Sequence, residues 1–375
     1  MLLHRLAAVA AAVLLSTALT VPASAAPKTV SGPGYLPQCF APWNQETKFF
    51  KWDAHQGPFR IALVNGFVGN IWRIQMIQTA KAFAALPDVA KDIKEFKVIS
   101  TGTDAAAQLG AIEDFINQGF DAIVVNAVSP TGFDRVVKLA NRKNVVLVPF
   151  DNVLDTAEVM QVNEDQTAMG VDSAKFLIEN VPNGGKILEV RGLPGNSVDR
   201  DRHEGFQKTM KESGKPYDIV EVVGNWAPGD SQKATADALA VHGHFDGIFT
   251  QGGSNGTVQA LIDAKQPFVP MAGEGENLFR QQIAQYKDQG LKGYSYGQSP
   301  ALVAIAMKAA IAALKGETMP QMVSIPIPVA DYKTLKDGEN YWSNLTVDFF
   351  APNAFEPCGI TFTAPQIMAQ SADNK

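Results

Sequence analysis

Apolar, strand-like runs alternate with helix-length amphipathic runs from Phe59 onward, and this alternation constrains the fold more than any other feature of the sequence. The runs typical of strands cover residues 61–65, 97–100, 122–126, 145–150, 186–190, 219–223, 247–250, 268–272 and 293–296. Helices are predicted between them, for example at 104–118 and 165–180, and another is predicted to begin with Ser299 as its cap and to run to about Leu314. The alternation indicates parallel sheets built from βαβ units, so the expected fold class is α/β.

The strands fall into two similar series, which predicts two doubly wound parallel-sheet lobes with a crevice between them. The polar segment 161–164 lies between the series and is a candidate hinge. We expect lobe 1 at 59–162 plus 299–325, lobe 2 at 163–298 plus 326–340, an N-terminal extension at 26–58 and a C-terminal extension at 341–375. Aromatic residues such as Trp43 and Trp52 indicate that the extensions wrap on a lobe, because they would otherwise be exposed.

Residues 1–25 have the features of a secretory signal peptide. His4 and Arg5 precede an apolar run, and small residues end the segment, which predicts cleavage after Ala25. The apolar run is shorter than the ~20 residues of a membrane-spanning helix. We therefore expect a soluble protein of the Gram-negative periplasm.

Cys39 and Cys358 are the two cysteines of the chain, one near each end of the predicted mature protein. An oxidising compartment favours a disulfide between them, with two free thiols as the alternative. The net charge of −6 argues against a nucleic-acid partner.

Polar or aromatic residues follow several of the predicted strands. Asn70 and Trp72 come after a glycine loop that follows the first strand, and Asp151 and Asn152 follow "VVLVPF". Further along the chain, Arg200, Trp226 and Glu274 follow "ILEV", "IVEVV" and "FVPMAG". Because the carboxyl ends of strands border the ligand crevice in open α/β sheets, these residues form one candidate pocket.

Between about Phe59 and Pro328 the chain resembles the ribose-binding-protein-like periplasmic sugar-binding proteins, the type I solute receptors of ABC importers. The resemblance rests on "IALVNGFVGNIW", "VVLVPFDN", "RGLPGNSVDRDRHEGF", "IFTQGGSNG", "MAGEGEN" and "YSYGQSP" in this order. It implies a three-segment hinge with crossings near Asn163, Gln298 and Ile325.

The resemblance also implies roles for individual residues. Asn70, Asp151, Arg200 and Gln298 stand where the family hydrogen-bonds sugar hydroxyls, Trp72 and Trp226 where aromatic rings sandwich the sugar, and Glu274 in the place of an aspartate. Three positions depart from the pattern: Asn152 replaces an arginine, Gly252 an asparagine and Arg73 an aromatic residue. The departures imply a ligand that is larger than ribose, differently hydroxylated, or acidic and paired with Arg73.

The side chains at these positions suit a sugar without the family comparison. A sugar has an apolar C–H face and a rim of hydroxyls, so its site needs flat aromatic surface and planar polar groups. Neither a catalytic triad nor a metal site is predicted: "GQSPA" lacks the second glycine of a nucleophile elbow, and His242 and His244 have no ligands at metal-site spacing.

We therefore expect a non-enzymatic, monomeric receptor without a cofactor that captures a monosaccharide or polyol and delivers it to an ABC permease. A sensor that docks on a chemoreceptor or sensor kinase is the alternative, and a periplasmic sugar-processing enzyme is a third. A DNA-binding repressor is disfavoured because a signal peptide stands where a helix-turn-helix would be.

Overall fold

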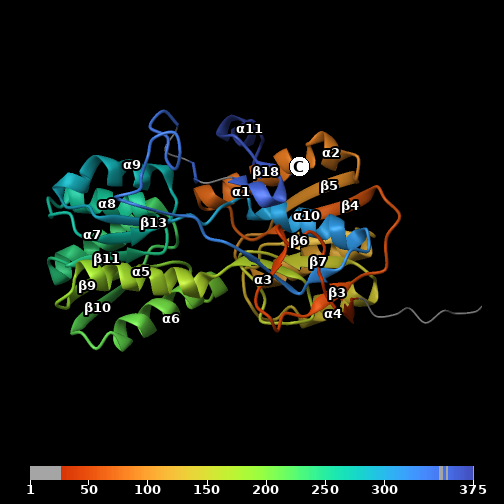
Figure 1. The fold of residues 1–375 in the computed structure, drawn as a ribbon, viewed down its shortest axis with the longest axis horizontal. Coiled ribbons are helices and arrows are strands. Elements are labelled where there is room, and N and C mark those ends of the chain that lie inside the picture. The colour runs from red at the N-terminus through yellow and green to blue at the C-terminus, as the bar shows by residue number, and fades with distance from the viewer. Residues whose placement is uncertain (1–26, 346–348, 352–353, 375) are drawn as a thin grey trace, which may run out of the picture.

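The structure is a computed structural model that describes residues 27–345, 349–351 and 354–374. The predicted signal peptide and its cleavage site lie outside these residues. Two α/β lobes lie side by side in Figure 1, so the predicted fold class is confirmed. Within the described residues, no helix has the length and apolar character needed to cross a membrane.

The first lobe is built on a four-stranded parallel sheet. Its strand order is β5 (Ile93–Ser100), β4 (Phe59–Asn65), β6 (Ala122–Val125) and β7 (Val146–Pro149). In β4, Ile61 and Leu63 enter one core with α1 (Ile71–Ala84) and α10 (Leu302–Leu314). Ala62 and Val64 enter the other core with α3 (Ala105–Asn117) and α4 (Asp134–Arg142). Successive residues point to opposite faces of a strand, so an uninterrupted apolar run is buried on both sides.

The second lobe is built on a six-stranded sheet. Its order is β10 (Tyr217–Val223), β9 (Gly185–Arg191), β11 (Gly247–Thr250), β12 (Met271–Gly273), β13 (Gly293–Tyr296) and β16 (Val329–Asp331), of which β16 alone is antiparallel to its neighbour. One core contains residues of α5 (Gln166–Asn180) and α6 (Ser197–Glu212), and the other contains residues of α7 (Pro228–His242), α8 (Ser254–Asp263) and α9 (Asn277–Tyr286). A doubly wound sheet covered on both faces results, as in the first lobe.

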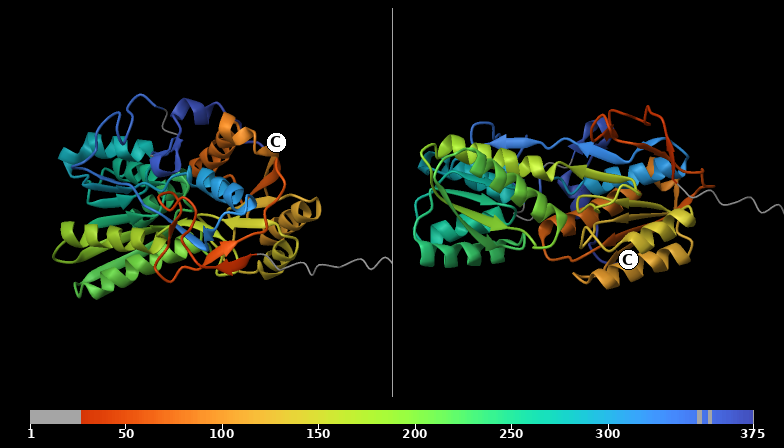
Figure 2. Two further views of the ribbon diagram at one scale, coloured as in Figure 1. Left: turned by 45° about the vertical axis from the view of Figure 1, so that its right-hand side comes forward. Right: turned by 90° about the horizontal axis from the view of Figure 1, so that it is seen from below.

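Three segments of the chain connect the two sheets. Figure 2 shows the two lobes from two further sides. The segment predicted as a hinge forms β8 (Gln161–Glu164), which is parallel to β15 (Met322–Ile325); β15 also pairs with β2 (Ala41–Pro42). The loop that contains Gln298 lies between β13 and α10. The exact limits of the lobes remain a prediction.

Both extensions contact the first lobe. Phe50 and Trp52 are buried in its core, and a small sheet joins β1 (Lys28–Val30), β3 (Phe49–Lys51) and β14 (Met319–Pro320). The C-terminal extension contributes β17 (Ala354–Phe355), η2 (Glu356–Cys358) and β18 (Ile360–Thr361), and its helix α11 (Ala364–Met368) contacts α1. The predicted disulfide between Cys39 and Cys358 is confirmed.

The segment 349–351 contacts both lobes. Gln75 of α1 exchanges two hydrogen bonds with the backbone of Phe350, at 2.7 and 3.1 Å. On the other side, the backbone N–H of Asn277 donates to Phe349 and that of Ala351 donates to Gly275, each at 2.9 Å. The extension therefore forms a further link between the lobes besides the three connecting segments.

One predicted boundary is wrong for a local reason. The helix expected to be capped by Ser299 begins at Leu302 with Ala301 as its cap. The Ser299 hydroxyl accepts from the backbone N–H of Ala301 at 3.1 Å, which closes a turn ahead of the helix rather than its first turn.

Candidate ligand-binding site

A small cavity lies between the lobes and collects most of the residues predicted for the pocket. It is lined by Asn70, Trp72, Arg73, Asp151, Asn152, Val198, Trp226, Glu274 and Gln298. Its free volume is about 20 Å³, roughly the space of one water molecule, so the lobes are nearly closed on each other at this point. Larger hollows occur elsewhere on the surface, but they are not lined by these residues.

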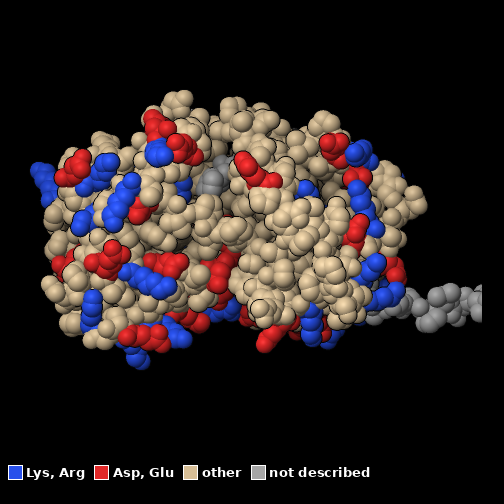
Figure 3. All heavy atoms as spheres, viewed as in Figure 1, with Lys and Arg blue, Asp and Glu red and all other residues tan. Residues whose placement is uncertain are grey.

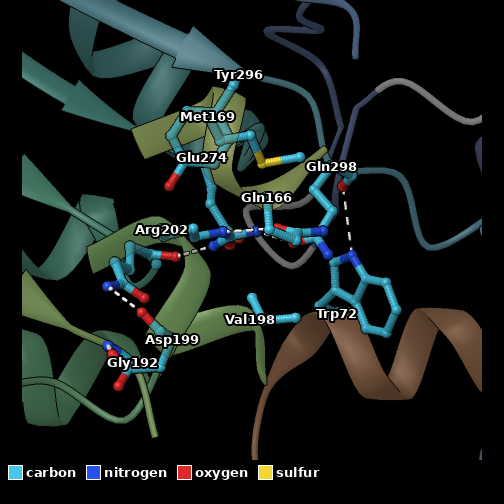
Figure 4. A network of polar contacts seen from close by, with 12 residues as sticks. Trp72, Gln166, Met169, Gly192, Val198, Asp199, Arg202, Glu274, Tyr296 and Gln298 are labelled. Atoms are coloured by element: carbon cyan, nitrogen blue, oxygen red, sulfur yellow. Dashed lines mark hydrogen bonds and ion pairs between the residues drawn. The ribbon is translucent and has the colours of Figure 1, made fainter. Parts of the chain in front are cut away.

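The start of α1 contributes the first-lobe wall of the cavity. Asn70 caps this helix, and its side-chain oxygen accepts from the backbone N–H of Arg73 at 2.9 Å. Trp72 is 5% exposed, and its indole N–H donates to the backbone oxygen of Gln298 at 3.3 Å (Figure 4). The cap therefore helps to place Trp72 and Arg73 at the cavity, because it fixes where the helix begins.

Asp151 follows β7 with a left-handed backbone, φ 59°. Its carboxylate accepts from Asn126 Nδ2 at 3.0 Å and from Gln298 Nε2. Burial raises the pKa of Asp151, and the nearby charge of Arg73 opposes that rise. A strained conformation held by neighbouring contacts is common at binding sites.

Asn152, the next residue, faces the same cavity. Its side-chain amide donates to the backbone oxygen of Ala127 at 2.9 Å. This bond fixes the amide group, so the loop after β7 presents two oriented polar side chains.

Trp226 contributes aromatic surface from the second lobe, and its turn is also strained. Asn225 and Trp226 have φ angles of 52° and 56°. The indole lies where a side chain on Gly192 would stand, because a Cβ there would be 2.0 Å from the ring. The indole N–H is buried and has no hydrogen-bond partner within the described part of the chain.

Gly252 does not line the cavity, but its lack of a side chain is required there. A Cβ at this position would lie 2.9 Å from Trp226 Cδ1 and 3.0 Å from Glu274 Oε2. Glycine thus leaves room for the indole and for the carboxylate that do face the cavity.

The sequence analysis missed Arg202, the most extensively hydrogen-bonded side chain near the cavity. Its guanidinium is fully buried and donates to Glu274 Oε1 at 2.6 Å, to the backbone oxygen of Gln251 at 2.7 Å, to Gln166 Oε1 at 2.8 Å and to Gln298 Oε1 (Figure 4). It therefore holds two cavity-lining side chains, Glu274 and Gln298, in place. Arg200 and Arg202 both lie near the start of α6, so the sequence could not distinguish them without knowledge of which helix face points to the cavity.

Arg200, the predicted ligand arginine, is not brought to the cavity. Its side chain is 39% exposed and donates to Asp155 at 2.9 and 3.2 Å and to Asp201 at 2.7 Å. Hydrogen bonds to Asp155 and Asp201 raise the pKa of Arg200. Because α6 turns about 100° per residue, a side chain two positions from Arg202 points away from the pocket.

Several carboxylates are buried at or beside the cavity. Burial raises the pKa of Glu274 to about 7, although the contact with Arg202 opposes the rise. Burial, followed by the charge of Asp151, raises the pKa of Glu164 in β8 well above its usual range. The site therefore combines preformed acceptors with one aromatic ring from each lobe.

One set of side chains within the described residues has a geometry that could hold a metal ion: Glu189, His203 and Glu221. None of the three lines the cavity. His203 Nδ1 lies 3.0 Å from Glu189, and Gln207 Nε2 donates to the same carboxylate at 2.7 Å. The protein's own donors thus satisfy this buried acid, and the set is interpreted as an ion pair between α6 and β9.

Comparisons with known proteins agree with this geometry. A family model described as "Periplasmic binding protein domain" matches residues 61–318. The ribose import binding protein RbsB of Bacillus subtilis is 25% identical over 243 residues, which cover 63% of this chain and 77% of that protein. The xylitol-binding protein of Mycolicibacterium smegmatis is 24% identical over 178 residues, 46% of this chain and 51% of that protein.

Solved structures share the fold. An ABC transporter solute binding protein from Thermobispora bispora superposes with a TM-score of 0.70 and 25% identity, covering 80% of this chain and 92% of that one. A periplasmic solute binding protein from Actinobacillus succinogenes with bound D-allose gives a TM-score of 0.64 at 23% identity, with 73% and 98% covered. With its two parallel-sheet lobes and a polar, aromatic cavity between them, the chain belongs to the periplasmic binding protein domain family.

Proposed function

We propose that the protein captures a monosaccharide or polyol in the cavity between its lobes and delivers it to an ABC importer. The observation that carries the proposal is the convergence of Trp72 and Asp151 from one lobe with Trp226 and Glu274 from the other on one small cavity. Relatives named for ribose and xylitol, and a neighbour with bound D-allose, support the same ligand class.

The chemistry of these side chains suits such a guest. Indole rings offer flat surfaces to the C–H face of a sugar, and carboxylates and amides bind its hydroxyls in defined directions. Hydrogen bonds to charged groups contribute roughly 1.5–3 kcal/mol each, so a sugar that lacks a matched hydroxyl should bind much more weakly.

The two lobes should close on the guest, because a guest in the cavity contacts both of them. Gln298 donates to Asp151, and Trp72 donates to Gln298, so the connecting loop is fixed against the first lobe. A guest that touches both lobes binds the closed form better than the open form, and this difference in affinity shifts the population toward closure. We infer that cleavage after Ala25 releases the mature protein into the periplasm as a monomer. A partner permease in the inner membrane would recognise the closed form of this monomer.

A screen of the mature protein by thermal shift tests the proposal. Pentoses, hexoses, polyols and sugar acids are compared, because a ligand that binds only the folded state raises the melting temperature. Asp151→Asn serves as the pocket variant, since asparagine tolerates the left-handed backbone at this position. Lys208→Ala, an exposed change on α6, is the matched control.

The expected result is a rise in melting temperature with one group of related sugars, which is lost in Asp151→Asn and kept in Lys208→Ala. The proposed function would be contradicted if none of these compounds raised the melting temperature. It would also be contradicted if a ligand raised the melting temperatures of Asp151→Asn and Lys208→Ala equally.

A further inference from the structure

Two buried guanidinium groups lie at or beside the cavity, and only one of them has a carboxylate in contact. Arg202 contacts the carboxylate of Glu274 at 2.6 Å. Arg73 is 3% exposed, yet no carboxylate of the described residues lies within 4.0 Å of it, and its one side-chain hydrogen bond there goes to the neutral amide oxygen of Asn65 at 2.7 Å. Arg73 is thus a buried cation without an anion in contact.

The pKa values of Arg73 and Arg202 shift in opposite directions. Burial lowers the pKa of Arg73 to about 10, and the more distant charge of Asp151 only partly opposes this. Burial also acts on Arg202, but its electrostatic interactions with Tyr296 and Glu274 outweigh burial and raise its pKa. Burying an ion is costly unless a counterion and hydrogen bonds compensate for the lost water, so an anion beside Arg73 would relieve this cost.

The acids of the cavity already have donors. Asp151 accepts from Asn126 and Gln298, and Glu274 accepts from Arg202. Arg73 is the one cationic side chain among the nine that line the cavity. It retains unused N–H donors, because a guanidinium carries five.

The position of Arg73 is fixed by its surroundings. Its guanidinium carbon lies 4.8 Å from the centre of the Phe67 ring and 5.9 Å from that of Trp72, and the backbone N–H is bonded to the Asn70 cap. A guanidinium held in this way presents a planar fork that matches the two oxygens of a carboxylate.

We propose that the guest is a sugar acid whose carboxylate is bound by Arg73, while its hydroxyls meet Asp151 and Glu274 and its C–H face meets the indole rings. This inference rests on the proposed function and narrows its ligand class.

Matched pairs of probes test the inference by calorimetry and thermal shift. The pairs are D-galactose with D-galacturonate, D-glucose with D-glucuronate, and D-ribose with D-ribonate, each measured against the unmodified protein. Arg73→Met removes the charge at similar length, and Arg73→Lys keeps the charge but not the planar fork.

The acid of at least one pair is expected to bind about 10- to 100-fold tighter than its neutral partner, the range given by one charge-assisted bond. Arg73→Met should abolish this preference and Arg73→Lys should retain part of it. Without ligand, Arg73→Met should melt no lower than the unmodified protein, because an uncompensated buried charge is removed.

Two outcomes are informative in different ways. Tight binding of a neutral sugar with no preference for its acid would overturn the inference and leave the proposed function intact. If no sugar, polyol or sugar acid binds, the proposed function fails and the inference fails with it.

Discussion

At the scale of single residues, strand ends were predictable and helix faces were not. Asp151, Trp226 and Glu274 follow strands whose carboxyl ends border the cavity. Their location therefore does not depend on how a helix is rotated about its axis. Arg200 and Arg202 both lie near the start of α6, and only the rotation of the helix decides which one faces inward. Sequence pattern placed an arginine there, but the packing of α6 on its neighbours determined that it is Arg202.

The raised pKa of Glu274, about 7, predicts a pH dependence of stability. The folded state binds this proton more tightly than the unfolded state, whose carboxyl titrates near 4.3. The contribution to stability is therefore complete below about pH 4 and is lost as the pH rises through 7, by up to about 3 kcal/mol. Chemical denaturation at a series of pH values measures it.

Glu274→Gln should flatten this pH dependence without abolishing it, because burial also raises the pKa values of Asp151 and Glu276 in the same direction. Glu212→Gln, an exposed change, is the control. If the pH dependence of stability were unchanged in Glu274→Gln, the pKa of this carboxyl would not differ between the folded and unfolded states.

At the scale of elements, α6 and the loop after β7 meet across the cleft. Arg200 of α6 forms a two-point ion pair with Asp155, whose backbone N–H is bonded to Pro130 of the first lobe at 2.8 Å. On the face shown in Figure 3, acidic and basic side chains are otherwise interspersed. Among the described residues this is the one ion pair that joins the two lobes, so it should favour the closed form.

Exposed ion pairs contribute roughly 0.2–1 kcal/mol, so Arg200→Asp should weaken ligand binding by up to about fivefold. The double variant Arg200→Asp with Asp155→Arg should restore the affinity, and added salt should reduce the difference. Arg135→Ala, which breaks an ion pair within the first lobe, should have no effect. An affinity that is insensitive to Arg200→Asp would show that the pair plays no part in closure.

The secondary structure was predictable to the extent that local pattern determines it. Strands β11 and β13 have the predicted bounds, because short apolar runs between turn residues are buried on both faces. The segment 161–164 was expected as a hinge because it is polar, and it does connect the lobes, but its buried strand structure was not predicted. Its pairing with β15 depends on residues about 160 positions away, which no local pattern reveals.

At the scale of the whole molecule, the extensions join the described residues nearest both ends of the sequence to the first lobe. The disulfide joins residues separated by 319 positions. Closing so long a loop restricts the unfolded chain, so Cys39→Ser with Cys358→Ser should lower the free energy of unfolding by about 2–5 kcal/mol. Denaturation of the oxidised protein and the double variant measures this, and equal midpoints would contradict it.

The central claim is that side chains from both lobes hold one small hydrophilic guest. Calorimetry with the tightest ligand from the screen tests it most directly, using Asp151→Asn for the first lobe and Trp226→Asn for the second. Each variant should lose at least about tenfold in affinity, which corresponds to one lost charge-assisted bond or aromatic contact. Full affinity in either variant, with the fold intact by circular dichroism, would show that its lobe does not bind the guest.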